Sequence, residues 1–307
     1  MREKRFSDKV SFTQAWERGR EEFKSRISRH EGSIMLIATK EVISIPPTMS
    51  IKGAADTIVR YNVRRLPVVD PGTNRLVGII GSSDIIEFLG GGEKYRIIEK
   101  KHKGNFLSAI NDSVKEIMVT DVVTVSTEDS IEDALEKILS TRIGGIVIVD
   151  DENRVKGIVT ERDFVFLLAD KITNKKVEDY MTKNVIVASP TMTLGDAAKI
   201  MVRNSFRRLP VVYQGELVGI ITTRNIIRFI GKNEVFNKIV LNNIAEVLDT
   251  KIEEIMSKEV ATVTEDRDLG EVAKIMEESG VGTVCVVEGG KLVGILTERD
   301  IVRAIGE

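Results

Sequence analysis

Short runs of β-branched and aliphatic residues recur along the chain, and each is closed by a polar turn and followed by a second run. Residues 146–150, for example, are separated from residues 155–159 by the polar segment 151–154. Two such runs joined by a short polar turn are typical of an antiparallel hairpin. Equivalent first runs lie at residues 66–70, 209–213 and 284–288. The pattern therefore predicts four hairpins.

Apolar residues at helical spacing precede each hairpin. One such stripe contains Ile131, Ala134, Leu135 and Ile138. Short β-branched runs come before three of these helices, at residues 122–125, 185–188 and 260–263. An apolar helix start also follows each hairpin. Each unit is therefore predicted to have the order βαββα, which places the chain in the mixed α/β (α+β) class.

A motif of the form Gly-h-h-Thr-x-x-Asp, where h is apolar, ends each hairpin and opens the next helix. In the second copy it spans residues 157–163, and the other copies begin at Gly78, Gly219 and Gly294. Four copies in one register indicate internal repeats. The spacings between the glycines are long, short and long. Odd repeats share Arg-Arg-Leu-Pro-Val-Val, whereas even repeats share Thr-Glu-Arg-Asp. We therefore expect repeats 1 and 2, and repeats 3 and 4, to be grouped.

A single unit of this size is marginal as a domain, because too little of its surface is buried. Pairing of units is expected to bury the remaining apolar faces, and a cleft between paired units is the natural place for a ligand. The predicted divisions are an N-terminal helical extension at 1–30, repeat 1 at 31–92, a helical connector at 93–113, repeat 2 at 114–171, repeat 3 at 172–231, a second connector at 232–250 and repeat 4 at 251–307.

Composition narrows the function classes. Charged residues make up 30% of the 307, but the formal net charge is only −2, which argues against binding along a nucleic-acid backbone. The single cysteine, Cys285, cannot form an internal disulfide, and its apolar surroundings indicate a buried strand residue. Residues 1–10 are charged and no apolar stretch is long enough to span a membrane. We expect a cytoplasmic protein with no membrane association.

The motif itself supports two interpretations. Thr-x-x-Asp resembles a capping box, and an acid in the first turn favours the helix dipole, so a helix start alone explains it. Alternatively, the carboxylate binds the two hydroxyls of a ribose while the Thr hydroxyl and free helix N–H groups hold a phosphate. Both interpretations can hold together, because capping need not use both carboxylate oxygens.

Paired arginines precede the hairpins of the odd repeats. Arg64-Arg65 and Arg207-Arg208 lie just before a Pro and an apolar strand. Salt-bridged or solvated arginines are one interpretation. The other is that these matched guanidinium forks bind phosphates.

These motifs resemble CBS repeats, the cystathionine-β-synthase-type module, over about residues 31–306. The four-repeat layout is similar to that of the γ subunit of AMP-activated protein kinase and of archaeal stand-alone proteins likened to it. The resemblance implies two modules of paired repeats that form a flat disc, with AMP, ADP or ATP bound in clefts between repeats. It implies no obligatory cofactor and no enzymatic activity.

The resemblance also assigns residues. Ribose hydroxyls would be bound by Asp84, Asp163, Asp300 and, as an amide, Asn225. The phosphate end would be bound by Arg64, Arg65, Arg207, Arg208, Ser83, Thr160, Arg162, Thr222, Arg224, Thr297 and Arg299. A hydroxyl residue after an Ile-Met element would line the sites, at Thr182, Ser257 and, less closely matched, Thr120.

Departures from the motif indicate that the four sites are not equivalent. Asn225 offers one acceptor and no charge, and Gly81 replaces the Thr of repeat 1. Residues 142–145 and 280–283 lack the arginine pair. We therefore expect fewer than four equivalent sites.

Other features carry weaker expectations. The Gly90-Gly91-Gly92 run before Lys94 lacks P-loop spacing and is expected to end the helix of repeat 1. The basic cluster at 100–103 is interpreted as a solvated helix face, with phosphate contact as the alternative. His30 and His102 have no neighbouring ligands in the sequence, so no metal site is expected.

The N-terminal segment carries an apolar stripe, consisting of Phe12, Trp16, Phe23 and Ile27, among many charges. We expect it to pack on repeat 1; the alternative is docking of a partner or of a second copy of the chain.

The favoured function is an adenine-nucleotide sensor of energy state that acts on an unidentified regulated protein, either as a monomeric disc or as a homodimer. One alternative is an interaction subunit with vestigial sites. Another is a binder of a different adenosyl ligand, such as S-adenosylmethionine, or of nucleic acid, the last disfavoured by the charge.

Overall fold

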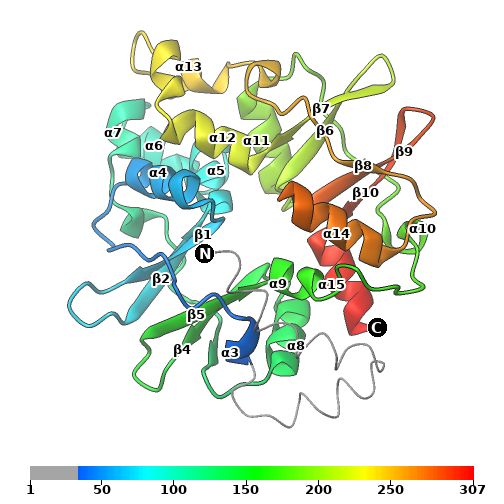
Figure 1. Cartoon of the computed structure of the whole chain (residues 1–307). Coiled ribbons are helices and arrows are strands. Elements are labelled where there is room, and N and C mark those ends of the chain that lie inside the picture. The colour runs from blue at the N-terminus through cyan, green and yellow to red at the C-terminus, as the bar shows by residue number, and fades with distance from the viewer. Residues whose placement is uncertain (1–33) are drawn as a thin grey trace. The chain divides into compact units, whose positions relative to one another are not determined.

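The computed structural model describes residues 34–307, so the N-terminal stripe of Phe12, Trp16, Phe23 and Ile27 lies outside the described residues. Within the described part, the four repeats follow the predicted order of first strand or bridge, helix, antiparallel hairpin and helix (Figure 1). The mixed α/β class predicted from the hydrophobic pattern is confirmed.

Repeat 2 shows the complete unit. Its sheet has the order β3-β4-β5, in which β3 pairs parallel with β4 and β4 pairs antiparallel with β5. Its elements are β3 (Thr124–Ser126), α8 (Ile131–Thr141), β4 (Gly145–Val149), β5 (Val155–Thr160) and α9 (Glu161–Phe166).

Repeat 4 has the same topology, with sheet order β8-β9-β10. Its elements are β8 (Thr262–Val263), α14 (Leu269–Ser279), β9 (Thr283–Glu288), β10 (Lys291–Thr297) and α15 (Glu298–Gly306). Cys285 lies in β9 and is fully buried as a free thiol, as expected.

The odd repeats reduce the first strand to one bridge, Ile45 with Val68 and Ala188 with Val211. Prolines follow within two residues, at Pro46 and Pro47 and at Pro190, and proline has no N–H to extend a ladder. The other elements of these repeats are α4 (Ile51–Tyr61), β1 (Arg65–Val69), β2 (Leu76–Gly81) and α5 (Ser82–Gly90), then α11 (Leu194–Arg203), β6 (Arg208–Tyr213), β7 (Glu216–Thr222) and α12 (Thr223–Gly231).

Short helices fill the segments between the repeats. These are α3 (Ile34–Ile37), α6 (Tyr95–Lys100), α7 (Phe106–Ile110), η1 (Val114–Glu116), α10 (Val177–Tyr180), η2 (Glu234–Lys238), α13 (Ile244–Leu248) and η3 (Ile252–Glu254). None of the helices in the described part of the chain is long and apolar enough to cross a membrane.

The described residues form two compact units. The odd-repeat unit contains repeats 1 and 3 (residues 43–122 and 185–260), and the even-repeat unit contains repeats 2 and 4 (residues 34–42, 123–184 and 261–307). In the odd-repeat unit α4 packs on α12 and α5 packs on α11. In the even-repeat unit α9 packs on α15. Each unit has its own apolar core.

Close helix contact in the odd-repeat unit depends on small residues. A Cβ added to Gly90 would lie 2.4 Å from the Cβ of Ala198, and one added to Gly231 would lie 3.3 Å from the backbone of Ala55. A larger residue at Gly90 would therefore force α5 and α11 apart.

Each hairpin is completed by the N-terminal segment of a different repeat. Thr39 pairs with Ile158 of repeat 2, and Val119 pairs with Ile79 of repeat 1. In the same way Thr182 joins repeat 4 through Ile295, and Ser257 joins repeat 3 through Ile220. The segment and the hairpin that it completes therefore come from repeats 1 and 2, or from repeats 3 and 4. This is the grouping predicted from the motif spacing. Helix packing, in contrast, joins repeat 1 with 3 and repeat 2 with 4.

The exchanged segments explain the motif glycines. A Cβ at Gly219 would lie 2.8 Å from the carbonyl oxygen of Ser257, and one at Gly294 would lie 2.6 Å from Sδ of Met181. At Gly157 the paired segment comes less close, because a Cβ there would lie 3.4 Å from the Cβ of Ala38 and 3.5 Å from the Thr39 carbonyl oxygen. The glycine thus admits another backbone.

Candidate functional site

The motif acids of the even repeats sit at helix starts. Oδ2 of Asp163 accepts hydrogen bonds from the N–H (2.9 Å) and Oγ1 (2.8 Å) of Thr160 at the start of α9. Oδ2 of Asp300 accepts the same pair from Thr297, at 2.9 and 2.7 Å, at the start of α15. This is the geometry of a capping box.

Capping uses one oxygen of each carboxylate. No residue among 34–307 donates a hydrogen bond to Oδ1 of Asp300. An ionised carboxylate can accept several hydrogen bonds on its two oxygens. The helix start is therefore compatible with a ligand hydroxyl on the second oxygen of Asp300.

Exchanged segments place hydroxyl residues beside the strands that lead to these acids. Thr182 exchanges two backbone hydrogen bonds with Ile295, at 2.9 and 3.0 Å, and Thr39 does the same with Ile158. Thr39 was missed in the sequence because Ala38 replaces the Met of the Ile-Met element. At the repeat 1 hairpin the equivalent position holds Val119, so Thr120 lies one residue beyond it.

In repeat 3 the motif amide is held on both sides. Oδ1 of Asn225 accepts hydrogen bonds from the N–H (2.9 Å) and Oγ1 (2.6 Å) of Thr222. Nδ2 of Asn225 donates to Oγ of Ser257 at 3.1 Å. The buried amide therefore connects the helix cap to the exchanged segment.

In repeat 1 both oxygens of the motif acid are engaged. Oδ2 of Asp84 accepts the N–H of Gly81 at 2.7 Å, and Oδ1 lies 2.6 Å from Nζ of Lys94. Lys94 also pairs with Glu87 at 3.0 Å. Burial by itself lowers the pKa of Lys94, but the negative charges of Asp84 and Glu87 raise the pKa of this ammonium overall.

The Thr-Glu-Arg-Asp motifs of the even repeats form two reciprocal ion pairs. Nε of Arg162 lies 2.8 Å from Oε1 of Glu298, and Nε of Arg299 lies 2.8 Å from Oε1 of Glu161. Glu161 and Glu298 are only 3% and 2% exposed. Both arginines assigned to phosphate by the resemblance thus use one nitrogen on a buried glutamate.

The arginine pairs lie at the open ends of the odd-repeat hairpins, where the second strand ends and the next helix begins. Arg65 pairs with Gly81 and Arg208 with Thr222 in the strand register. The carbonyl oxygens of Arg64 and Arg207 accept the first N–H groups of α5 and α12, at 3.0 and 2.9 Å. Both pairs therefore belong to the odd-repeat unit, where exposed Ser83 and Arg224 lie in the first turns of the same helices.

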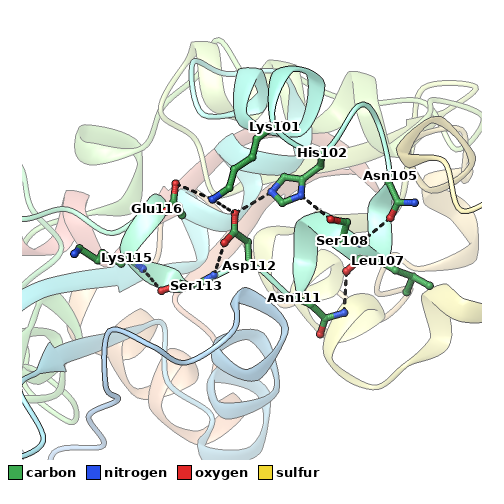
Figure 2. Close-up of polar contacts among 10 residues, drawn as sticks. All are labelled: Lys101, His102, Asn105, Leu107, Ser108, Asn111, Asp112, Ser113, Lys115 and Glu116. Atoms are coloured by element: carbon green, nitrogen blue, oxygen red, sulfur yellow. Dashed lines mark hydrogen bonds and ion pairs between the residues drawn. The ribbon is translucent and has the colours of Figure 1, made fainter.

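Two residues of the basic cluster in the first connector, Lys101 and His102, contact carboxylates (Figure 2). Lys101 pairs with Asp112 at 2.8 Å and with Glu116 at 3.3 Å. His102 bonds Asp112 through Nε2 and Ser108 through Nδ1, both at 2.8 Å. A catalytic Ser–His–Asp triad would need a free N–H to bind an oxyanion, but the N–H of Ser108 donates to the Asn105 side chain. The hydrogen bonds that join Ser108, His102 and Asp112 instead hold α6 and α7 against η1.

No cluster of three potential metal ligands occurs among the residues that the structure describes. The triglycine run ends α5 as expected, because Gly91 adopts the left-handed conformation at the helix C-terminus.

Comparisons with known proteins agree with this architecture. Protein MJ1225 of Methanocaldococcus jannaschii, itself uncharacterised, is 44% identical over 273 residues, covering 88% of this chain and 98% of that protein. Its crystal structure, described as a proposed archaeal homologue of γ-AMPK, matches with a TM-score of 0.84 at 43% identity, covering 89% of this chain and 99% of the other.

Two further relatives extend the comparison. An uncharacterised 33.4 kDa protein of a Thermofilum pendens ribosomal RNA operon is 31% identical over 257 residues, covering 84% of this chain and 85% of that protein. An uncharacterised conserved protein of Pyrococcus horikoshii shares the fold, with a TM-score of 0.55 at 22% identity, covering 88% of this chain and 97% of the other. The CBS domain family matches residues 33–91, 114–170, 177–232 and 252–307. The chain therefore belongs to the family of CBS-domain proteins and carries four CBS domains.

Proposed function

We propose that this CBS-domain protein is a non-catalytic regulator that binds adenine nucleotides (AMP, ADP or ATP), with Asp163 and Asp300 binding ribose hydroxyls. The observation that carries the proposal is the one-sided capping of Asp300: Oδ2 holds the helix start and Oδ1 is available to a ligand. Thr182 lies beside the strand that leads into this motif. A carboxylate next to a hydroxyl residue suits a cis-diol.

Phosphate binding is proposed for the helix starts. Thr297 and the first turn of α15 lie at the positive end of the helix dipole, which favours an anion. The matched placement of Arg64, Arg65, Arg207 and Arg208 at strand starts next to α5 and α12 supports their assignment to phosphates.

The proposed role is that of an energy-state sensor acting on a partner protein. Support comes from MJ1225, 44% identical, which is described as a proposed homologue of γ-AMPK. AMP and ATP differ in charge, so their exchange would change the electrostatics around the arginines of the CBS domains.

The test is calorimetric titration of AMP, ADP and ATP into nucleotide-stripped protein, with Asp300→Asn and Asp163→Asn variants. Asn225 shows that an amide keeps the cap, so these changes remove charge and an acceptor without removing the helix start. We expect binding at the altered site to weaken about tenfold or more, the loss that one charge-assisted hydrogen bond predicts.

Asp133→Asn is the matched control. Asp133 caps α8 of the same CBS domain as Asp163 through Oδ2, which accepts the Ser130 N–H at 2.9 Å, but it lies outside the motif. It should leave all titrations unchanged. Flat titrations of wild-type protein with all three nucleotides would reject the proposal.

The reciprocal ion pairs favour a second candidate, an adenosyl ligand without phosphate such as S-adenosylmethionine. Arg162 and Arg299 already use Nε on Glu298 and Glu161, which leaves them less free for a charged phosphate. Titration with S-adenosylmethionine, adenosine and ATP separates the two, because tight binding of the first two without the third would favour the second candidate.

A further inference from the structure

The triglycine turn after α5 directs the chain back along its own helix. Gly91 has a φ of +91°, and a Cβ at Gly92 would lie 2.3 Å from Cγ of Glu87. Both positions are therefore closed to ordinary side chains, at Gly91 by its conformation and at Gly92 by space. The consequence is that Lys94, two residues later, reaches both Glu87 and Asp84.

Lys94 contacts a particular oxygen of the motif acid. In all three motif aspartates Oδ2 faces the helix cap. Lys94 lies 2.6 Å from Oδ1 of Asp84, the atom whose counterpart in Asp300 has no donor among residues 34–307. It thus takes the position that the proposed function gives to a ribose hydroxyl.

The ion pair is well sheltered from solvent. The side chains of Lys94 and Asp84 are 22% and 18% exposed, and the pKa of Lys94 is raised by its carboxylate partners in spite of burial. A partly buried, charge-assisted contact is stronger than a surface ion pair. A neutral hydroxyl entering this site would have to displace an ammonium.

We propose that Lys94 is an internal occupant of the ribose-binding carboxylate of repeat 1, and that this lysine excludes repeat 1 from binding the nucleoside. The inference rests on the proposed function of the motif acids. It assigns Lys94 as the residue that decides whether Asp84 is used by a ligand, although repeat 1 keeps both the acid and the Arg64-Arg65 pair.

The experiment is calorimetric titration of AMP and of adenosine into stripped full-length protein carrying Lys94→Gln. We expect one additional equivalent of bound ligand, or binding at one site tightened about tenfold, because the competing charge is removed. Lys94→Gln combined with Asp84→Asn should return the protein to the wild-type titration. Lys94→Arg should behave as wild type, because it keeps the charge.

Lys52→Gln is the matched control. Lys52 pairs with Asp56 at 2.9 Å in the same CBS domain, with side chains 21% and 33% exposed, but neither residue belongs to the motif. It should leave the titration unchanged, and thermal unfolding of each variant verifies that the fold is kept.

The outcomes separate the two proposals. If wild-type protein binds and Lys94→Gln binds equally or more weakly, the role of Lys94 is overturned and the proposed function stands. A gain in Lys94→Gln that Asp84→Asn does not reverse would also overturn it. If neither wild type nor variant binds, both fail; if only the variant binds, Lys94 is the occupant and the even-repeat sites are rejected.

Discussion

The even-repeat and odd-repeat units share one fold but place their charges differently. In the even-repeat unit Glu161 and Glu298 are buried and hold arginines that come from the other repeat. At the equivalent helix starts the odd-repeat unit has Ser82 and Thr223, which carry no charge.

The motif acids differ in a related way. Asp300 keeps one oxygen available, whereas Asp84 is neutralised by Lys94 and Asn225 is tied to Ser257. The same CBS fold therefore holds a motif side chain with a free oxygen in one repeat and a fully engaged motif side chain in others. The difference depends on a few side chains, which can be exchanged individually.

The largest effect should come from breaking a buried ion pair of the even-repeat unit. Arg162→Ala removes the contact between Nε of Arg162 and Oε1 of Glu298, a glutamate that is 2% exposed. We expect unfolding to become easier by about 2–4 kcal/mol, toward the lower side of the usual cost because the arginine is partly exposed. Urea unfolding measures this.

Two variants serve as controls for that prediction. Arg162→Ala with Glu298→Gln should recover part of the loss, because the buried negative charge is gone. Arg154→Ala removes exposed pairs with Asp150 and Glu152 in the same unit and should change stability little. If the Arg162→Ala protein were as stable as the Arg154→Ala protein, the buried ion pairs would not distinguish the even-repeat unit from the odd-repeat unit in stability.

A second comparison uses the motif glycines. Gly219→Ala brings a Cβ to 2.8 Å from the Ser257 carbonyl oxygen, so host hairpin and exchanged segment must separate, at a cost of about 2 kcal/mol. Gly157→Ala brings a Cβ to 3.2 Å from the Ile148 side chain, 3.4 Å from the Ala38 side chain and 3.5 Å from the Thr39 carbonyl oxygen, and should be tolerated better. Thermal unfolding of the two variants measures the difference. Equal losses of stability would show that the exchanged segment is not the reason a glycine is needed at these positions.

Repeat 3 offers a test with a smaller effect on stability. Asn225→Asp keeps the acceptor for Thr222 but loses the hydrogen bond donated to Ser257. We expect a cost of about 1 kcal/mol, typical of one hydrogen bond, together with a gain of adenosine binding. Calorimetry and thermal unfolding measure both. Stability loss without any gain in binding would show that the acid alone does not open the site.

The smallest effect concerns the connector of the odd-repeat unit. Burial opposes ionisation of Asp112, but hydrogen bonds from Lys101, Ser113 and His102 hold its pKa below the ordinary value. A lowered pKa means that the native state prefers the charged form, so this contribution is present above pH 3.8 and is lost as pH falls further. Asp112→Asn should lower the unfolding temperature slightly at pH 7, and by less near pH 3. A constant difference across that range would contradict the assignment.

Local patterns predicted much of the molecule. The two β-branched runs around the polar segment 151–154 predicted the hairpin, and Thr-x-x-Asp predicted the cap at Thr160, because both depend on neighbours a few residues away. The first strand predicted at residues 185–188 of repeat 3 was too long, since only Ala188 forms a bridge. The proline that shortens it was visible in the sequence.

Contacts between distant segments were beyond the sequence patterns. Arg162 and Glu298 are 136 residues apart, and nothing local indicates that the arginine of one motif meets the glutamate of another. The triglycine run before Lys94 was interpreted only as the end of a helix, and no role was predicted for Lys94. Its contact with Asp84 depends on the direction in which the turn sends the chain, which side-chain types alone do not encode.

The exchange of segments also determines how such a chain can be inherited. The hairpin of repeat 1 is completed by Val119, in the N-terminal segment of repeat 2, and the hairpin of repeat 2 is completed by Thr39, in the N-terminal segment of repeat 1. A single repeat copied or deleted in a genome would leave one hairpin without its third segment and one segment without a host. Two consecutive repeats are therefore the smallest piece of this sequence that can be duplicated, lost or transplanted as a whole.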